Sequence, residues 1–165
     1  YTIMIKKIFF LISFILFLST SLYAASTGNS SDGNDYAGGK TKYKKASLLI
    51  KDAKKLEKKN KVKKAKKKYK KALKYLVETN KSEPNKPDTL NYLGYASRKL
   101  GNFEIAEKYY LEGLSIDPNH IGINEYLGEL YVITNRIDKA IERLEVLENC
   151  NCEEYSELQT LISKN

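Results

Sequence analysis

The two cysteines are the residues whose type and spacing best fit covalent chemistry. Cys150 and Cys152 stand near the end of the chain and are separated by one residue. Two thiols this close tend to pair in an oxidising compartment, although the bond of a Cys-x-Cys pair closes a very small ring. The pair is therefore a candidate disulfide that staples a terminal helix to the segment before it.

A thiol-active or metal-dependent role is the alternative for Cys150 and Cys152. A thioredoxin-like redox site needs a Cys-x-x-Cys motif on an α/β framework, and the sequence has no strand pattern. Zinc needs further ligands, and none stands near in the sequence. The sequence favours the structural staple, and an accessory factor acting through these thiols stays as the alternative.

Few other residues fit catalysis. His120 is the only histidine, and a single imidazole without a catalytic partner is usually structural. Glu125 and Glu129 share a helix face because they are four residues apart, which favours an acidic patch. The sequence contains no glycine-rich phosphate loop and no cluster with metal-ligand spacing. We therefore predict no catalytic residue, no metal site, no cofactor and no enzymatic activity.

An internal repeat organises the second half of the chain. Residues 87–120 recur 34 residues later as residues 121–154, and each unit has the pattern of two short helices. A fixed period of this length is typical of a solenoid of stacked helical hairpins. Such a unit provides a surface without an active site, so binding of another macromolecule is expected. The coinciding positions are Tyr92, Leu93, Gly94 and Ala106 with Tyr126, Leu127, Gly128 and Ala140.

The segment from Thr89 to Asn119 resembles a tetratricopeptide repeat over its full length. Leucines at helical spacing face inward, and Gly94 and Gly128 allow a neighbouring helix to approach. Tyr110 and Leu144 are expected to fill the space that these small residues leave. An earlier, more degenerate unit breaks at residue 60, and its second helix is expected to be about two turns longer than that of the next unit.

The resulting fold prediction is all-α. It is a right-handed superhelix of about three tetratricopeptide-type helical hairpins plus a C-terminal capping helix. The expected repeats cover residues 46–83, 87–120 and 121–152, and the capping helix covers residues 153–163. Three repeats are about the minimum for stability in such a stack.

The family resemblance implies a concave groove lined by the first helix of each hairpin. Residues spaced three and four apart on those helices give a groove that runs from basic to acidic, with a tyrosine near its middle. Aromatic residues amid fixed charges are the usual anchors of a peptide-binding surface. We expect a non-catalytic adaptor that binds a protein or peptide segment there. The candidate groove residues are Lys51, Lys55, Asn91, Tyr95, Arg98, Glu125 and Glu129.

The N-terminal region has the pattern of a secretory signal. Lys6 and Lys7 precede an apolar run, which ends in small residues up to Ala24. We expect cleavage after residue 24, a flexible linker at residues 25–41, a repeat domain at residues 42–165 and a periplasmic protein. The alternative is an inner-membrane protein anchored by an uncleaved signal, because residues 8–25 approach the lower limit for a membrane span.

Charge is distributed unevenly along the chain. Residues 40–81 contain 19 lysines and three acidic residues, a net charge of +16, whereas residues 82–165 have a net charge of −7. A hairpin this basic attracts polyanions. Nucleic acid is a poor fit, because arginine, the usual base reader, is absent from this stretch. An anionic envelope or membrane surface is an alternative partner, and lysines that only solvate two helices are the simpler interpretation.

Overall fold

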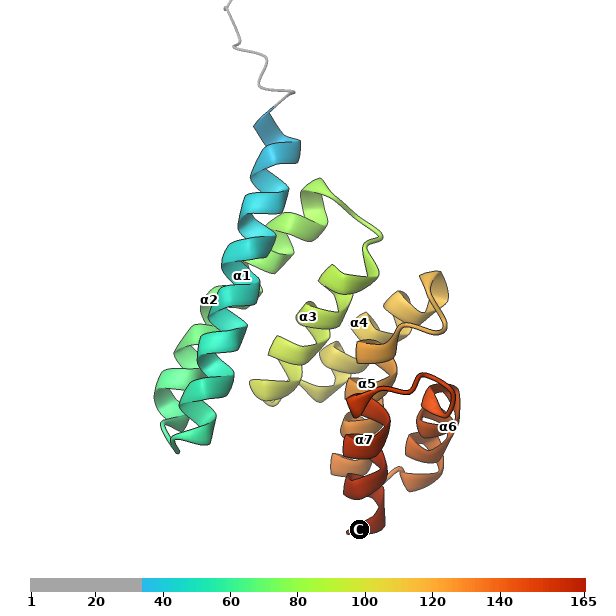
Figure 1. Ribbon diagram of the computed structural model, residues 1–165. Helices are drawn as coiled ribbons and strands as arrows, with labels where there is room; N and C mark the ends of the chain where they lie inside the picture. The colour runs from blue at the N-terminus through green and yellow to red at the C-terminus, as the bar shows by residue number, and fades with distance from the viewer. Residues whose placement is uncertain (1–33) are drawn as a thin grey trace, which may run out of the picture. The chain divides into compact units, whose positions relative to one another are not determined.

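The computed structural model describes residues 34–165, and these residues form seven α-helices and no strand (Figure 1). This arrangement is an all-α helical repeat solenoid, as the sequence predicts. No helix within residues 34–165 combines the length and the apolar character needed to cross a bilayer. The expected signal segment, residues 1–24, lies outside the described residues. The helices are α1 (Asn34–Lys58), α2 (Val62–Ser82), α3 (Pro87–Lys99), α4 (Phe103–Ile116), α5 (Ile121–Ile133), α6 (Ile137–Leu147) and α7 (Glu153–Ser163).

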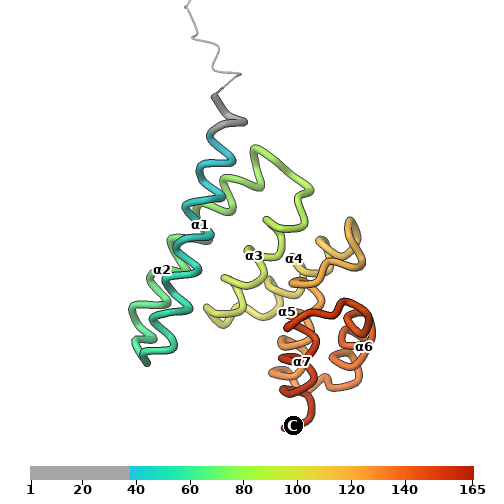
Figure 2. The backbone as a smooth tube through the Cα atoms, in the orientation of Figure 1, coloured from blue at the N-terminus to red at the C-terminus, as the bar shows by residue number. Residues whose placement is uncertain are grey.

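The first six helices form three antiparallel hairpins, which are followed by α7 (Figure 2). The chain leaves the first helix of each hairpin through a residue with positive φ: Asn60 at 56°, Gly101 at 89° and Asn135 at 58°. Glycine and asparagine adopt this left-handed conformation at little cost. A residue in the left-handed conformation therefore turns the chain at the same place in all three hairpins, including the degenerate first one. As expected, α2 is longer than α4, with 21 residues against 14.

Small residues set the packing distance between helices. A Cβ built at Gly94 would overlap the ring of Tyr110, which is fully buried. At the equivalent position one period later, a Cβ at Gly128 would overlap Leu158 of α7. The expectation that Leu144 fills that space is wrong, since Leu144 is only half-buried. The reason is that α7 follows α5 by about one period and packs against it like the first helix of a further unit.

The first helix begins earlier than expected. Residues 34–41 belong to α1, so the predicted flexible linker at residues 25–41 is too long at its C-terminal end. Gly39 is buried, and a Cβ there would collide with the side chain of Glu83, which caps the end of α2. Its missing side chain lets the start of α1 pack closely on the end of α2. A stretch rich in glycine and polar residues thus becomes helical through a tertiary contact, which outweighs its low helix propensity.

Candidate functional site

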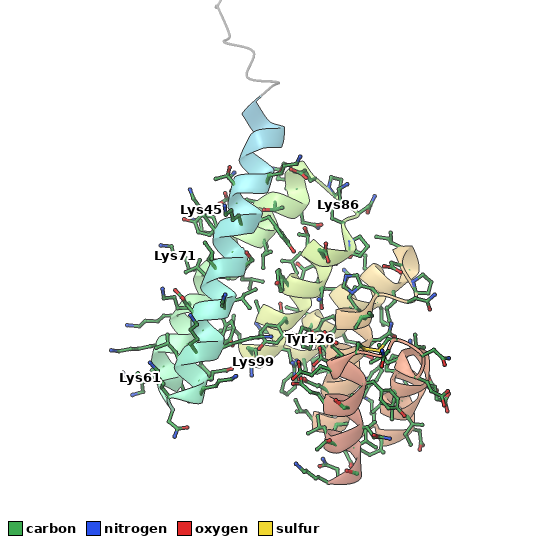
Figure 3. All side chains as sticks on the ribbon, viewed as in Figure 1. Lys45, Lys61, Lys71, Lys86, Lys99 and Tyr126 are labelled. Atoms are coloured by element: carbon green, nitrogen blue, oxygen red, sulfur yellow. A yellow bond between two sulfur atoms is a disulfide. The ribbon has the colours of Figure 1, made fainter. Side chains whose placement is uncertain are left out.

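A cleft of about 290 Å³ lies where α1, α3, α5 and α7 meet. The first helix of each hairpin contributes one side of it, and α7 closes the acidic end. Figure 3 shows Lys99 and Tyr126 in this region, between the first hairpin and the C-terminal helices. The lining residues are Lys54, Glu57, Lys58, Tyr95, Arg98, Lys99, Glu125, Tyr126, Glu129 and Glu157.

Two tyrosines and one lysine form the centre of the cleft. The rings of Tyr95 and Tyr126 pack with their centroids 4.7 Å apart. The Nζ of Lys54 lies 4.6 Å from the first centroid and 5.1 Å from the second, and it donates a 2.8 Å hydrogen bond to the Tyr126 hydroxyl. Burial lowers the pKa of Lys54, and the nearby carboxyl groups of Glu125 and Glu129 oppose that shift. An ammonium group is therefore held over two aromatic faces.

Ion pairs inside the cleft join neighbouring hairpins. Arg98 of α3 contacts Glu129 of α5 at 2.5 Å, and the arginine side chain is only 5% exposed. Lys99, also on α3, contacts Glu57 of α1 at 2.9 Å. Charge-assisted contacts of this kind have a defined geometry. Removing one partner of a buried ion pair strongly destabilises the folded protein, because the other charge is left buried and unpaired. The walls of the cleft are thus held in place by the stacking of the hairpins.

The acidic end of the cleft contains a carboxyl group in an unusual state. Glu125 is 3% exposed and forms no ion pair with any basic residue in the described part of the chain. Burial, the charge of Glu129 and a hydrogen bond with Glu157 together raise its pKa to about 9. A like charge nearby disfavours the ionised form. Glu125 therefore keeps its proton at neutral pH and shares a hydrogen bond with a second carboxyl group.

Four of the seven expected groove residues meet in this cleft, namely Tyr95, Arg98, Glu125 and Glu129. Asn91 does not line it. This side chain is buried beside Gly122, where a Cβ would lie 2.8 Å from the Asn91 Nδ2 atom.

Lys51 and Lys55 do not line the cleft either, because both are exposed on α1. The core side of α1 is set by Ala46, Ile50 and Ala53. That phase turns Lys54 toward the cleft and Lys51 and Lys55 away from it. The buried alanines could have revealed this phase in the sequence, since they recur at helical spacing.

Three cleft residues had no clear signal in the sequence. Glu57 and Lys99 stand at the ends of their helices, where a three-and-four spacing gives no firm direction. Glu157 comes from α7, whose expected role was only to cap the stack. Nothing in a single sequence places a capping helix at the mouth of the groove.

His120, Cys150 and Cys152, the residues whose types best fit chemistry, have structural roles. His120 is the N-cap of α5: its Nδ1 accepts a hydrogen bond from the Ile123 amide at 3.2 Å, and its Nε2 lies 3.1 Å from Asp88. Cys150 and Cys152 are joined by a disulfide between α6 and α7, with their Cα atoms 5.2 Å apart. Among residues 34–165, no group of three histidine, cysteine, aspartate or glutamate side chains is arranged to hold a metal ion.

The family model described as the tetratricopeptide repeat matches residues 87–120, which form α3, α4 and the loop after them. The chain contains a tetratricopeptide repeat. The matched unit is the middle hairpin, which supplies Tyr95, Arg98 and Lys99 to the cleft. The repeat is a known protein-interaction module, and its fold is typically a scaffold without catalytic residues.

Solved structures similar to this chain have the same fold. The first such domain of Spaghetti (RPAP3), bound to an HSP90 peptide, is 20% identical with a TM-score of 0.53; the match covers 74% of this chain and 93% of that one. The TPR2B domain of yeast Sti1 in an Hsp70 complex is 20% identical with a TM-score of 0.54, covering 73% and 94%. The Yersinia enterocolitica secretion chaperone SycD, in complex with a peptide of the translocator YopD, is 18% identical with a TM-score of 0.51, covering 72% and 86%.

One curated protein is similar in sequence to part of this chain. The Sol locus transcriptional repressor of Clostridium acetobutylicum is 31% identical over 78 residues. That match covers 47% of this chain and 24% of the repressor. The matched part of the chain therefore spans about a quarter of the repressor's length.

Proposed function

We propose that this protein is a non-catalytic adaptor that holds an extended segment of a partner protein in the cleft. The observation that supports this most directly is the composition of the cleft, which pairs two tyrosine faces with a basic wall and an acidic wall. The similar domains of Spaghetti and SycD were solved with peptides, which agrees with a segment as the ligand.

The charges of the cleft define the chemistry of the segment. Lys58 and Lys99 lie on the side of α1 and α3, whereas Glu129 and Glu157 lie on the side of α5 and α7. A segment with acidic residues at one end and basic residues at the other would match both walls. Complementary charge of this kind mainly sets orientation and the rate of association, and the aromatic centre provides the anchor.

A synthetic ten-residue peptide with glutamates at one end and lysines at the other tests this function. Its addition should shift the backbone amide signals of Tyr126, Glu129 and Lys99 in the NMR spectrum of the protein. Tyr126→Ala should weaken binding by about fivefold or more, as expected for an interface hot spot. Tyr155→Ala is the matched control, because this tyrosine is also half-buried but lies on α7 outside the cleft.

The outer side of the first hairpin is a second candidate surface. Figure 3 shows Lys45, Lys61 and Lys71 along this side, and all three are exposed. An anionic envelope or membrane surface is the partner that fits a face so rich in lysine. If the peptide shifts only the amide signals of α2 and binds Tyr126→Ala normally, the cleft is not the site. An electrostatic surface binder would then be the better description.

We also propose that the protein acts in the periplasm after export. The lysine-primed apolar run before Ala24 and the Cys150–Cys152 disulfide support this location, because disulfides persist in oxidising compartments. N-terminal sequencing of the protein isolated from the envelope should find Ala25 as the first residue. A chain that retains the apolar run in the membrane fraction would instead indicate the uncleaved inner-membrane anchor.

A further inference from the structure

A lysine of the protein itself occupies the aromatic centre of the cleft. Lys54 reaches from α1 to Tyr126 on α5, where its ammonium group makes a 2.8 Å hydrogen bond to the hydroxyl and lies over the rings of Tyr95 and Tyr126. The carboxyl groups of Glu125 and Glu129 favour its charged form without an ion-pair contact. The cleft thus already holds a primary ammonium group on aromatic faces.

Two of the neighbouring carboxyl groups have no ion-pair partner among the described residues. Glu129 is paired with Arg98, but neither Glu125 nor Glu157 forms an ion pair with a basic residue in the described chain. Glu125 is also 97% buried while it lines the cleft. A buried carboxyl group that lacks a cation, beside an aromatic pair that holds one, is a binding environment for a second or better-placed ammonium group.

We propose that the cleft recognises a lysine side chain of the bound segment, and that Lys54 fills this position in the unbound protein and leaves when the segment binds. This inference rests on the function proposed above and specifies its ligand. A partner lysine would lie over Tyr95 and Tyr126 and would reach the carboxyl groups of α5 and α7. The displaced Lys54 would return to solvent along α1, beside the exposed Lys51 and Lys55.

The internal lysine makes the site selective. An apolar or acidic side chain that displaced Lys54 would remove the cation closest to both tyrosine rings. Of the described residues, only Arg98 and Lys99 would remain near them, at 5.4–5.7 Å from the ring centroids, and Arg98 is already paired with Glu129. A lysine from the partner replaces the lost contacts, so the net cost of displacement is small. The protein thereby discriminates against segments that lack a basic residue, at the expense of some affinity for those that have one.

Proton release is a further consequence of a better-placed cation. The pKa of Glu125 is raised to about 9 by burial, by Glu129 and by the contact with Glu157. A positive charge from the segment would favour the ionised carboxylate and would lower that pKa. Binding below about pH 9 should therefore release a proton from Glu125, and affinity should rise as the pH approaches 9 from neutral. The other groups facing Glu125 are Glu154 on α7, Lys54 on α1 and Arg98 on α3.

Two single-charge variants of α1 test the role of Lys54. Lys54→Met removes the internal ammonium but keeps most of the side chain, and Lys55→Met removes the same charge from an exposed position one residue away. A peptide with one central lysine should bind Lys54→Met about tenfold more tightly than the wild type, which corresponds to about 1.4 kcal/mol. Lys55→Met should change its affinity by less than about twofold, since exposed charges contribute little.

A second arm uses n-butylammonium, the end of a lysine side chain, as the probe. In Lys54→Ala it should fill the vacated position and shift the ring signals of Tyr95 and Tyr126 in a saturable way. Wild-type protein should show much weaker shifts at the same concentration, and sodium chloride at equal ionic strength should show none. Calorimetry of the peptide in buffers with different ionisation enthalpies should detect the released proton, and the Glu125→Gln variant should not release it.

The outcomes separate this inference from the proposed function. If the peptide binds the cleft but its norleucine counterpart binds equally well and Lys54→Met changes nothing, the lysine site is wrong and the adaptor function stands. If n-butylammonium binds Lys54→Ala in the cleft but no peptide binds any form, the ammonium site stands and the peptide function fails. If n-butylammonium leaves Tyr95 and Tyr126 unaffected, the inference is overturned.

Discussion

Tyr110→Ala is expected to lower the free energy of unfolding by about 3–5 kcal/mol, the usual range for removing a large buried aromatic side chain. Tyr110 is fully buried, and its ring packs against the backbone at Gly94. That contact leaves no side chain at position 94 that could move into the space, so a cavity would persist between α3 and α4. Urea denaturation followed by circular dichroism at 222 nm measures the change.

Leu111→Ala is the matched control for Tyr110→Ala. Leu111 is the next residue of α4, and its side chain is about half exposed. Its truncation should change stability by less than about 0.5 kcal/mol, because surface positions usually contribute little. Equal losses for the two variants would show that α4 is destabilised by any truncation, and the role assigned to the ring at Gly94 would be wrong.

Gly94→Leu should destabilise the protein by about 1–3 kcal/mol or more, because it forces extra volume into a filled contact. Even a Cβ at this position would overlap the ring of Tyr110, and both groups lie in the interior of a hairpin. The strain has to separate α3 from α4 or move the ring from its rotamer. The urea concentration at the midpoint of unfolding should fall accordingly. The m-value, which is the slope of the unfolding free energy against urea concentration, should change little.

Two further variants make the Gly94 prediction specific. Gly38→Ala adds a Cβ at a helical position where no other atom lies within 4 Å of it, so it should be neutral or slightly stabilising. Gly94→Leu combined with Tyr110→Ala should cost less than the two single changes added together, because the leucine can enter the cavity. Strict additivity would mean that residues 94 and 110 do not share a contact.

The fold could be predicted from the sequence because residues with the same structural role recur at equivalent positions of the repeat units. Gly101 and Asn135 stand one period apart and both take positive φ, so the turn chemistry alone locates two of the hairpins. The N-terminal end of α1 was harder to predict from the sequence. The helical state of residues 34–41 depends on Gly39 packing against the end of α2, and a contact between segments far apart in the chain has no local signature.

The candidate site was predictable where the repeat fixes the direction of a side chain. Tyr95 and Arg98 come from the unit with the clearest pattern, and they do line the cleft. On α1 the family pattern is weak, and an error of one residue in helical phase substitutes Lys55 for Lys54. Such an error is large in effect, because successive residues point about 100° apart around a helix.

The ion pairs in the cleft also make its surface dependent on the stacking of the hairpins. Arg98–Glu129 and Lys99–Glu57 each join two different hairpins, and Lys54 reaches Tyr126 across the same boundaries. A chain with its first hairpin detached would lose Lys54, Glu57 and Lys58 from the cleft at once. The surface that a partner meets therefore exists only on a completely stacked molecule, so recognition at this site would also distinguish a finished copy from a partly folded one.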